Sequence, residues 1–386
     1  MNKYFIFASD ERSYLDLKNI VLELKNRNLP YFFLYSREPQ RISPAHNIDK
    51  FNYDSNIEPT SKKNRYNTLG FDLHFTPDYL IISNEVWDPE KMIAYEFKTK
   101  GAFIVGIETS SYITADVKSK LEILSRKSFP SNTIDIFFDP SNWGLQTKLL
   151  SGWYKNKSVV VGNPKYDDLK PKIKNTTKNI ILIHGLKDKY YQNLLMEKIN
   201  NDIIPKFKNY KIYYKPHPYE IVDLPEYFEE GYIKNTKIKL ISNHEEYLSI
   251  LENSKYVISY FTSLLFFPLI YDRKIIILLR DIEKIDISSF SKHFNKKDYD
   301  FWKNILKFNS YEEFKNIIGK NYINSINKRN NQINKDLNKY LISYKDINDL
   351  DNQACNNTPI LKYFNEFKDQ KSSSRIVDFL ESNLVY

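Results

Sequence analysis

Residues 4–35 read YFIFASDERSYLDLKNIVLELKNRNLPYFFLY, and this stretch decides the fold class. An apolar run at 4–8 is followed by the helical spacing of apolar residues over 14–26, and a second apolar run follows at 31–35. Two short apolar runs on either side of an amphipathic helix predict two parallel strands joined by a crossover helix. The chain therefore begins as a parallel α/β sheet.

The same alternation continues along the chain in two cycles. Strands of a parallel sheet are buried on both faces, so they appear as continuous apolar runs separated by helical patterns. The further strands predicted in the first cycle are 78–83, 102–108, 134–138 and 158–161, and its helices are 89–99, 115–125 and 141–150. In the second cycle the predicted strands are 179–184, 210–214, 237–242, 256–259 and 274–279, and the helices are 188–204, 245–253, 263–271, 311–318, 323–342 and 373–384.

The length of 386 residues accommodates two domains of roughly 150 residues or more. A Gly-Asn-Pro turn at 162–164 and the polar stretch after it predict an inter-domain linker at 163–178. The sequence thus predicts an α/β protein with two Rossmann-like domains, 1–162 and 179–365, whose ligand lies in a cleft between them. Residues 37–70 give no assignable pattern.

The chain carries a formal net charge of +9, from 57 Lys and Arg against 48 Asp and Glu. Such a balance suits contact with nucleic acid, an anionic membrane leaflet or a phosphorylated substrate. The lysines are scattered rather than massed, and the sequence has neither zinc-finger spacing nor an RNA-binding aromatic pattern, so nucleic acid is not an expected partner. Contact with an anionic membrane and binding of a phosphorylated substrate stay open.

The single cysteine, Cys355, rules out an intramolecular disulfide and a zinc site built on cysteines, which fits a reducing compartment. No run approaches the roughly 18–20 apolar residues that a membrane crossing needs. The first residues turn polar too soon for a signal peptide. The expected location is the cytoplasm, with peripheral attachment to the inner membrane as an alternative.

The segment Lys215-Pro216-His217-Pro218 follows a predicted strand. The two prolines that flank His217 fix the backbone and prevent a helix there. Open α/β sheets bind ligands at the carboxyl ends of their strands, and a lysine beside a histidine suits a phosphate group. The alternative is a proline-rich turn with an incidental surface lysine and histidine.

Two further segments follow strands of the same predicted domain. Thr262-Ser263 begins a predicted helix, whose free N–H groups would bind an anion, although a plain capped helix explains the same residues. His184-Gly185 ends another strand, and glycine lets the backbone approach a ligand closely. Because all three segments follow strands of one parallel sheet, we expect them to meet at one phosphate-bearing ligand.

Segments 162–167, 214–218 and 259–267 together resemble GT-B glycosyltransferases of bacterial surface-polysaccharide synthesis. The similar families are the capsule Kdo transferases, the CDP-glycerol glycerophosphotransferases and the sialyltransferases with a His-Pro motif. The tail at 372–380 looks like the closing helix of such chains. The resemblance implies that 366–386 form a helix that crosses back to the N-terminal domain.

In those families the first domain binds the acceptor and the second binds the nucleotide-activated donor. The resemblance implies donor contacts from Lys215, His217, Pro218, Thr262 and Ser263, with His184 and Gly185 adjacent. It favours a CMP- or CDP-linked donor over a UDP-sugar. Tyr260-Phe261 precede Thr262 where the families have a fuller run of serines, so the identity of the donor stays open.

Transfer also requires a base that deprotonates the acceptor hydroxyl and groups that stabilise the leaving phosphate. Acidic residues follow three predicted strands of the first domain: Asp10, Glu85 and Glu108. Asp10 is the first candidate base and Glu85 the second, and the alternative for each is an acidic residue at a helix start. No Asp-x-Asp motif lies where a metal–diphosphate site is expected, so the predicted reaction uses neither a metal nor another cofactor.

The predicted function is a glycosyltransferase that moves a sugar or related group from a nucleotide-activated donor to a bacterial surface glycan, free or lipid-linked. Two alternatives use the same scaffold. One is a UDP-sugar transferase or nucleotide-sugar epimerase, and the other is a non-catalytic protein that binds glycan or nucleotide.

Overall fold

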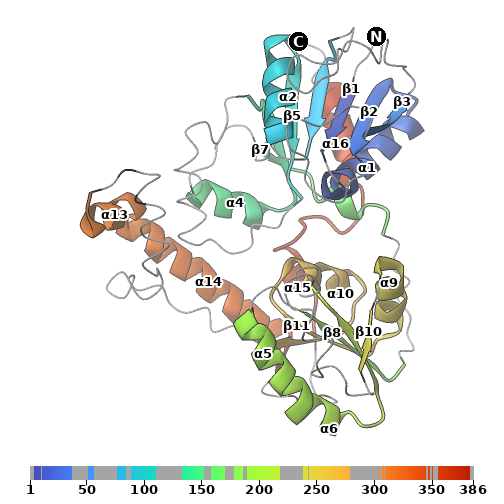
Figure 1. Cartoon of the computed structure of the whole chain (residues 1–386), viewed down its shortest axis with the longest axis vertical. Coiled ribbons are helices and arrows are strands. Elements are labelled where there is room, and N and C mark those ends of the chain that lie inside the picture. Colours follow the sequence, from blue (N-terminus) through green and yellow to red (C-terminus); the bar gives the residue numbers. More distant parts are fainter. Residues whose placement is uncertain are drawn as a thin grey trace. The chain divides into compact units, whose positions relative to one another are not determined.

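The computed structural model describes residues 4–9, 11–36, 51–55, 76–83, 88–109, 133–151, 158–169, 178–185, 189–217, 238–241, 243–278, 303, 307, 309–344, 347, 350 and 355–382. The chain divides into two compact units, each with its own sheet (Figure 1). The first unit consists of residues 1–169, 285–329 and 362–386, and the second of residues 170–284 and 330–361. The predicted class, two Rossmann-like α/β domains, is confirmed, whereas the predicted cleft stays a prediction.

The first unit is built on a seven-stranded sheet with the order β3-β2-β1-β4-β5-β6-β7. Its strands are β1 (Tyr4–Ala8), β2 (Tyr31–Ser36), β3 (Phe51–Ser55), β4 (Tyr79–Ile82), β5 (Phe103–Ile107), β6 (Ile136–Asp139) and β7 (Ser158–Val160). Neighbouring strands are parallel except for β3, which pairs antiparallel with β2 at the edge. Every residue of β1 and β4 is buried, which explains why continuous apolar runs predicted these strands.

Helices cover both faces of this sheet. They include α1 (Glu11–Asn26), α2 (Asp88–Thr99), α4 (Asn142–Ser151) and α16 (Ser372–Ser382). Helix α13 (Tyr311–Ile318) also belongs to the first unit, and α14 (Lys320–Tyr340) begins there and continues into the second unit. Side chains alternate along a strand, so Tyr4, Ile6 and Ala8 pack in one cluster with α1 and α16. Phe5 and Phe7 pack on the opposite face in a second cluster, with α2.

The C-terminal helix α16 belongs to the first unit, as predicted. Its residues Ile376, Val377 and Leu380 are buried in the cluster that α1 and the sheet share. The Tyr79 hydroxyl of β4 donates a hydrogen bond to the Leu380 carbonyl at 2.8 Å. Helix α16 therefore contributes to the same hydrophobic core as β1, the first strand of the chain.

Residues 163–169 belong to the first compact unit, and the linker at 163–178 stays a prediction. The Asp167 carboxylate accepts hydrogen bonds from the backbone N–H groups of Ser372, at 3.1 Å, and Ser373, at 2.6 Å, at the start of α16. Burial raises the pKa of Asp167 by more than these hydrogen bonds lower it. The Gly-Asn-Pro turn leads into a segment that caps the closing helix, because the first N–H groups of a helix need an acceptor.

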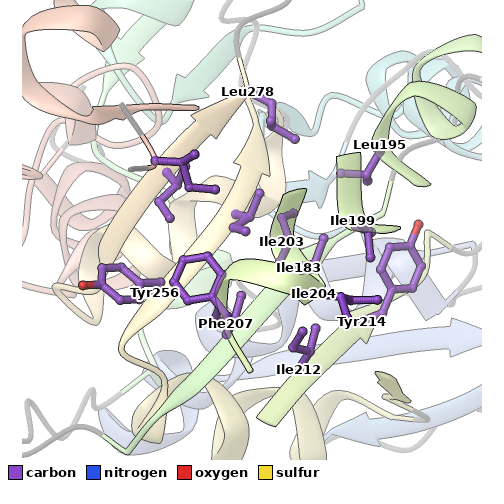
Figure 2. Packing of buried hydrophobic residues seen from close by; sticks show 14 of the residues in the cluster. Ile183, Leu195, Ile199, Ile203, Ile204, Phe207, Ile212, Tyr214, Tyr256 and Leu278 are labelled. Atoms are coloured by element: carbon purple, nitrogen blue, oxygen red, sulfur yellow. The ribbon is translucent and has the colours of Figure 1, made fainter. Parts of the chain in front are cut away.

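The second unit has a six-stranded parallel sheet with the order β10-β9-β8-β11-β12-β13. Its strands are β8 (Ile180–His184), β9 (Lys211–Lys215), β10 (Ile238–Leu240), β11 (Tyr256–Tyr260), β12 (Lys274–Leu278) and β13 (Ile342–Ser343). The helices are α5 (Lys189–Lys198), α6 (Ile204–Lys206), α9 (His244–Asn253), α10 (Phe266–Ile270) and α15 (Thr358–Leu361). Figure 2 shows part of its core, where Leu195 and Ile199 join Ile183, Ile212 and Tyr214 of the sheet.

The structure differs from the predicted elements where proline or an edge position changes the pattern. The predicted helix 188–204 contains a π-helical turn, Ile199–Ile203, before Pro205, which lacks the N–H that a regular helix uses. Strand β3 lies within 37–70, where Asn52 and Asp54 interrupt the apolar pattern of an edge strand. The predicted helix 115–125 lies outside the described residues.

Candidate functional site at the strand crossover of the second unit

The sheet of the second unit reverses its direction of growth between β8 and β11. From β8 the chain adds β9 and β10 on one side, and it then returns to add β11, β12 and β13 on the other. Ligands of open α/β sheets bind outside the carboxyl ends of the strands at such a switch point. His184 is the last residue of β8 and Gly185 follows it there, and the segment after Tyr260 follows β11.

The register of the strands brings the predicted ligand residues to this edge. His184 of β8 is the register partner of Lys215 of β9, and the Gly185 N–H donates to the Lys215 carbonyl at 2.8 Å. On the other side Ile183 of β8 pairs with Ile258 of β11. Because neighbouring strands lie about 4.8 Å apart, the ends of β9 and β11 flank β8 at a separation of about 10 Å.

Four of the predicted residues keep exposed surface at this edge. Lys215, His217 and Thr262 are half-buried and Ser263 is exposed, while Pro218 lies outside the described residues. Burial lowers the pKa of Lys215, and the negative charge of Glu246 in α9 opposes that shift. The site therefore combines a partly desolvated lysine with a carboxylate whose negative charge favours the charged form of that lysine.

The helix predicted at 263–271 is shorter than expected. A 3-10 turn, Ser263–Leu265, precedes α10, and Pro268 lacks the N–H that a longer regular helix would use. Thr262 has an extended backbone at the start of the turn, and its side chain makes no capping hydrogen bond. The alternative interpretation, a plain capped helix, is therefore not supported at Thr262, because its hydroxyl is not held by the turn that follows it.

His184 lies beneath this edge rather than on it. The side chain is 1% exposed, and its two ring nitrogens lie 3.0 Å from the Ser259 hydroxyl and 3.2 Å from the Tyr247 hydroxyl. Burial, with a smaller contribution from the positive charge of Lys215, lowers the pKa of His184 to about 3. His184 is thus a buried neutral group, which the sequence did not predict, because Tyr247 and Ser259 are distant in the chain.

Of the three predicted bases in the first unit, Asp10 and Glu85 lie outside the described residues. Glu108 is buried at the end of β5, where its carboxylate lies 3.1 Å from the Lys148 ammonium. The same ammonium forms an ion pair with the fully buried Asp139, at the end of β6. Burial lowers the pKa of Lys148, but Asp139 and Glu108 raise it further, so the net shift is upward and the lysine stays charged.

Glu90 of α2 is a buried acidic residue that the sequence reasoning missed. Its Oε1 accepts hydrogen bonds from the Ser9 hydroxyl and, at 3.2 Å, from the Ser13 hydroxyl. Ser9 directly follows β1, next to the point where the first sheet also reverses its growth, between β1 and β4. Ser9 and Glu90 are 81 positions apart in the chain, so no local pattern points to this contact.

Replacing Glu90 with alanine is expected to destabilise the first unit by about 2 kcal/mol, because buried hydroxyl donors lose their acceptor. The measurement is the free energy of unfolding in urea. Glu96→Ala, on the same helix, is the matched control, since Glu96 pairs with Lys100 near the surface and should cost less than about 1 kcal/mol. Equal losses in the two variants would contradict the role given to Glu90.

The described residues contain neither a cluster of metal ligands nor a helix suited to crossing a membrane. No group of three or more His, Cys, Asp or Glu side chains gathers there as metal ligands would. Among the helices of those residues, none combines the length and the apolarity that a membrane crossing needs.

No protein family and no curated protein matches the sequence. A Listeria monocytogenes protein assigned as a UDP-N-acetylglucosamine 2-epimerase matches in structure with a TM-score of 0.54 at 12% identity, over 100% of this chain and 97% of that one. The UDP-GlcNAc 2-epimerase of Neisseria meningitidis, bound to UDP-GlcNAc, matches with a TM-score of 0.50 at 11% identity, over 99% and 100%. A single-residue variant of the wall teichoic acid polymerase TagF matches with a TM-score of 0.49 at 12% identity, over 99% and 89%.

Likeness at these identities concerns the fold alone. The first two structures share the two-domain α/β fold of this chain, the fold class of GT-B proteins. The TM-score of TagF is too low to carry an argument. The fold implied by the sequence resemblance is thereby confirmed.

Proposed function

We propose that this chain is an enzyme acting on a nucleotide-activated sugar, most specifically a glycosyltransferase whose second unit binds the phosphates of the donor. The observation that supports the proposal is that Lys215, Gly185 and the Thr262–Ser263 turn lie at the carboxyl ends of three neighbouring strands. That edge is the switch point at which α/β sheets bind their ligands.

The proposed chemistry follows from the groups at this edge. Negative charge develops on the leaving phosphate as its bond to the sugar breaks, and fixed cations and hydrogen-bond donors stabilise that charge. Lys215 supplies a cation, His217 a second donor, and the turn at 262–263 supplies hydroxyl and N–H groups. Gly185 has no side chain to keep a phosphate away from the strand end.

The sequence resemblance favours a CMP- or CDP-linked donor and a surface glycan, free or lipid-linked, as acceptor. A UDP-sugar, for transfer or for epimerisation, is the second candidate. It is supported by the two structures of highest TM-score reported above, which are a protein assigned as a UDP-N-acetylglucosamine 2-epimerase and an epimerase bound to UDP-GlcNAc.

The acceptor base is proposed in the first unit. Asp10 and Glu85 remain the candidates, in that order. Glu108 is withdrawn, because a buried carboxylate paired with Lys148 has neither the access nor the freedom to take a proton from a hydroxyl. The reaction is proposed to proceed without a metal or other cofactor, and the protein to work in the cytoplasm, with attachment to the inner membrane as an alternative.

Replacing Lys215 or His217 with alanine is expected to weaken nucleotide binding at least tenfold, which corresponds to the loss of one charge-assisted contact of about 1.4 kcal/mol. The measurement is the Kd for CMP, CDP, UDP and UDP-GlcNAc, by calorimetry or thermal shift. Lys211→Ala is the matched control, because Lys211 is exposed at the opposite end of the same strand.

The pattern of binding separates the candidate functions. Preference for CMP or CDP supports the proposed donor class, and preference for UDP supports the second candidate. If none of the nucleotides binds to the unmodified protein, a role in handling nucleotide-activated sugars is ruled out.

A further inference from the structure

His184 connects three elements of the second unit through its two ring nitrogens. It ends β8, its Nδ1 faces Ser259 of β11, and its Nε2 faces Tyr247 in the first turns of α9. Helix α9 packs against β8, and the Tyr247 ring also contacts the Phe267 ring of α10 edge-on, with centroids 5.6 Å apart. A single imidazole thus lies where the strands and helices beneath the site meet.

The direction of each hydrogen bond follows from what its partner can do. The Ser259 hydroxyl lies 2.8 Å from the Tyr260 carbonyl, which can only accept, so the serine proton is used there. Ser259 must then accept from His184, which places a hydrogen on Nδ1. In a neutral ring the other nitrogen is an acceptor, so the Tyr247 hydroxyl donates to Nε2.

We propose that His184 is a positioning residue of the phosphate site: as the neutral Nδ1–H tautomer it joins Tyr247 of α9 to Ser259 of β11. The chain of hydrogen bonds runs from Tyr247 through His184 and Ser259 to the backbone of Tyr260. The consequence for ligand binding rests on the function proposed above, whereas the tautomer does not.

The two ends of this chain lie next to the groups that would meet a phosphate. Tyr260 is the last residue of β11, and Thr262 follows it two positions later. Tyr247 follows Glu246, whose negative charge acts on Lys215. His184 itself is the register partner of Lys215. Holding the imidazole in place therefore fixes both the start of the Thr262 turn and the surroundings of the lysine.

A protonated ring would not serve this role. It would place a second cation beside Lys215. Among the described residues, the carboxylate whose charge acts on that lysine is Glu246. The other titratable groups packed against His184 are Tyr247 and, stacked on that tyrosine, His244. A neutral imidazole satisfies the geometry without adding charge to the site.

The first arm of the test observes the tautomer directly. In the full chain with 15N-labelled histidine, His184 should show a protonated Nδ1 and an unprotonated Nε2 at neutral pH. Tyr247→Phe should shift the Nε2 resonance, because it removes the hydroxyl that donates to it. Tyr213→Phe, which removes a hydroxyl from the adjacent strand β9, should leave the resonance unchanged. A hydrogen on Nε2 would overturn the proposal.

The second arm measures the Kd for CMP, CDP, UDP and UDP-GlcNAc in two variants of His184. Asparagine can place an amide donor near the position of Nδ1, whereas leucine has a similar size and no donor. We expect His184→Leu to weaken binding about tenfold and His184→Asn to retain affinity within about threefold of the unmodified protein. Equal affinity in all three proteins would overturn the positioning role.

The two arms distinguish failure of this inference from failure of the proposed function. If the unmodified protein binds none of these four nucleotides, the proposed function is wrong and the positioning role is overturned with it, although the tautomer can still be correct. If the nucleotides bind and the leucine variant binds as well as the asparagine variant, only the positioning role is wrong. Circular dichroism of each variant confirms that the fold is retained.

Discussion

Replacing Gly162 with alanine is expected to destabilise the first unit by about 3 kcal/mol. Gly162 has a φ of +94°, a conformation that costs a residue with a Cβ about 1–2 kcal/mol. An added Cβ would lie 2.5 Å from the Ser372 hydroxyl and 2.9 Å from Asn365 Oδ1. Asn365 accepts a hydrogen bond from the Asn163 N–H, at 3.1 Å, so it cannot move without losing that bond.

Gly101→Ala is the matched control for this prediction. Gly101 has a φ of +92°, almost the same as Gly162, but an added Cβ there meets no atom within 4 Å. It should therefore show the cost of the backbone conformation alone, about 1–2 kcal/mol. Urea unfolding of both variants gives the difference. A loss in the Gly162 variant no larger than in the Gly101 variant would show that the start of α16 has room to adjust.

Replacing Lys148 with methionine is expected to destabilise the first unit by about 3–5 kcal/mol, because removing one partner of a buried ion pair leaves uncompensated charge. The Lys148 side chain is 2% exposed, and it neutralises Glu108, 8% exposed, and Asp139, 0% exposed. Methionine matches the length of the lysine side chain, so the loss of volume is small. The measurement is again the free energy of unfolding.

Two comparisons make this prediction specific. Lys98→Met removes the partner of Asp135 from an ion pair whose lysine is 38% exposed, and it should cost less than about 1 kcal/mol. Adding Asp139→Asn to Lys148→Met should restore part of the lost stability, because one of the two buried negative charges is then absent. A double variant less stable than Lys148→Met would contradict the account of charge balance.

The parts of the fold that follow from local sequence were predicted well. Strands β1 and β8 consist of five consecutive buried residues each, so their apolar runs are visible without any tertiary information. Strand β3 was missed because an edge strand needs one apolar face at most, and Asn52 and Asp54 alternate with its other residues. The splitting of two predicted helices was also missed, although Pro205 and Pro268 stand in the sequence as signals.

The sequence predicted which strands the candidate residues end or follow, whereas their binding of a ligand stays a prediction. The rule that ligands lie at the carboxyl ends of strands located Lys215 and the turn at 262–263. The same rule assigned His184 to the ligand, whereas its side chain points to the sheet face that α9 covers. That distinction depends on Tyr247 and Ser259, and their contact with His184 spans 63 and 75 positions of the chain.

The packing of α16 has a consequence for the order in which the protein is completed on the ribosome. The first strand of the chain, β1, shares its core with Ile376, Val377 and Leu380, which are synthesised after every strand of the second unit. Part of the apolar surface of the N-terminal half therefore stays uncovered while the second sheet is synthesised. Translation speed and chaperones acting on nascent chains should consequently matter more to this half than to the half that emerges later.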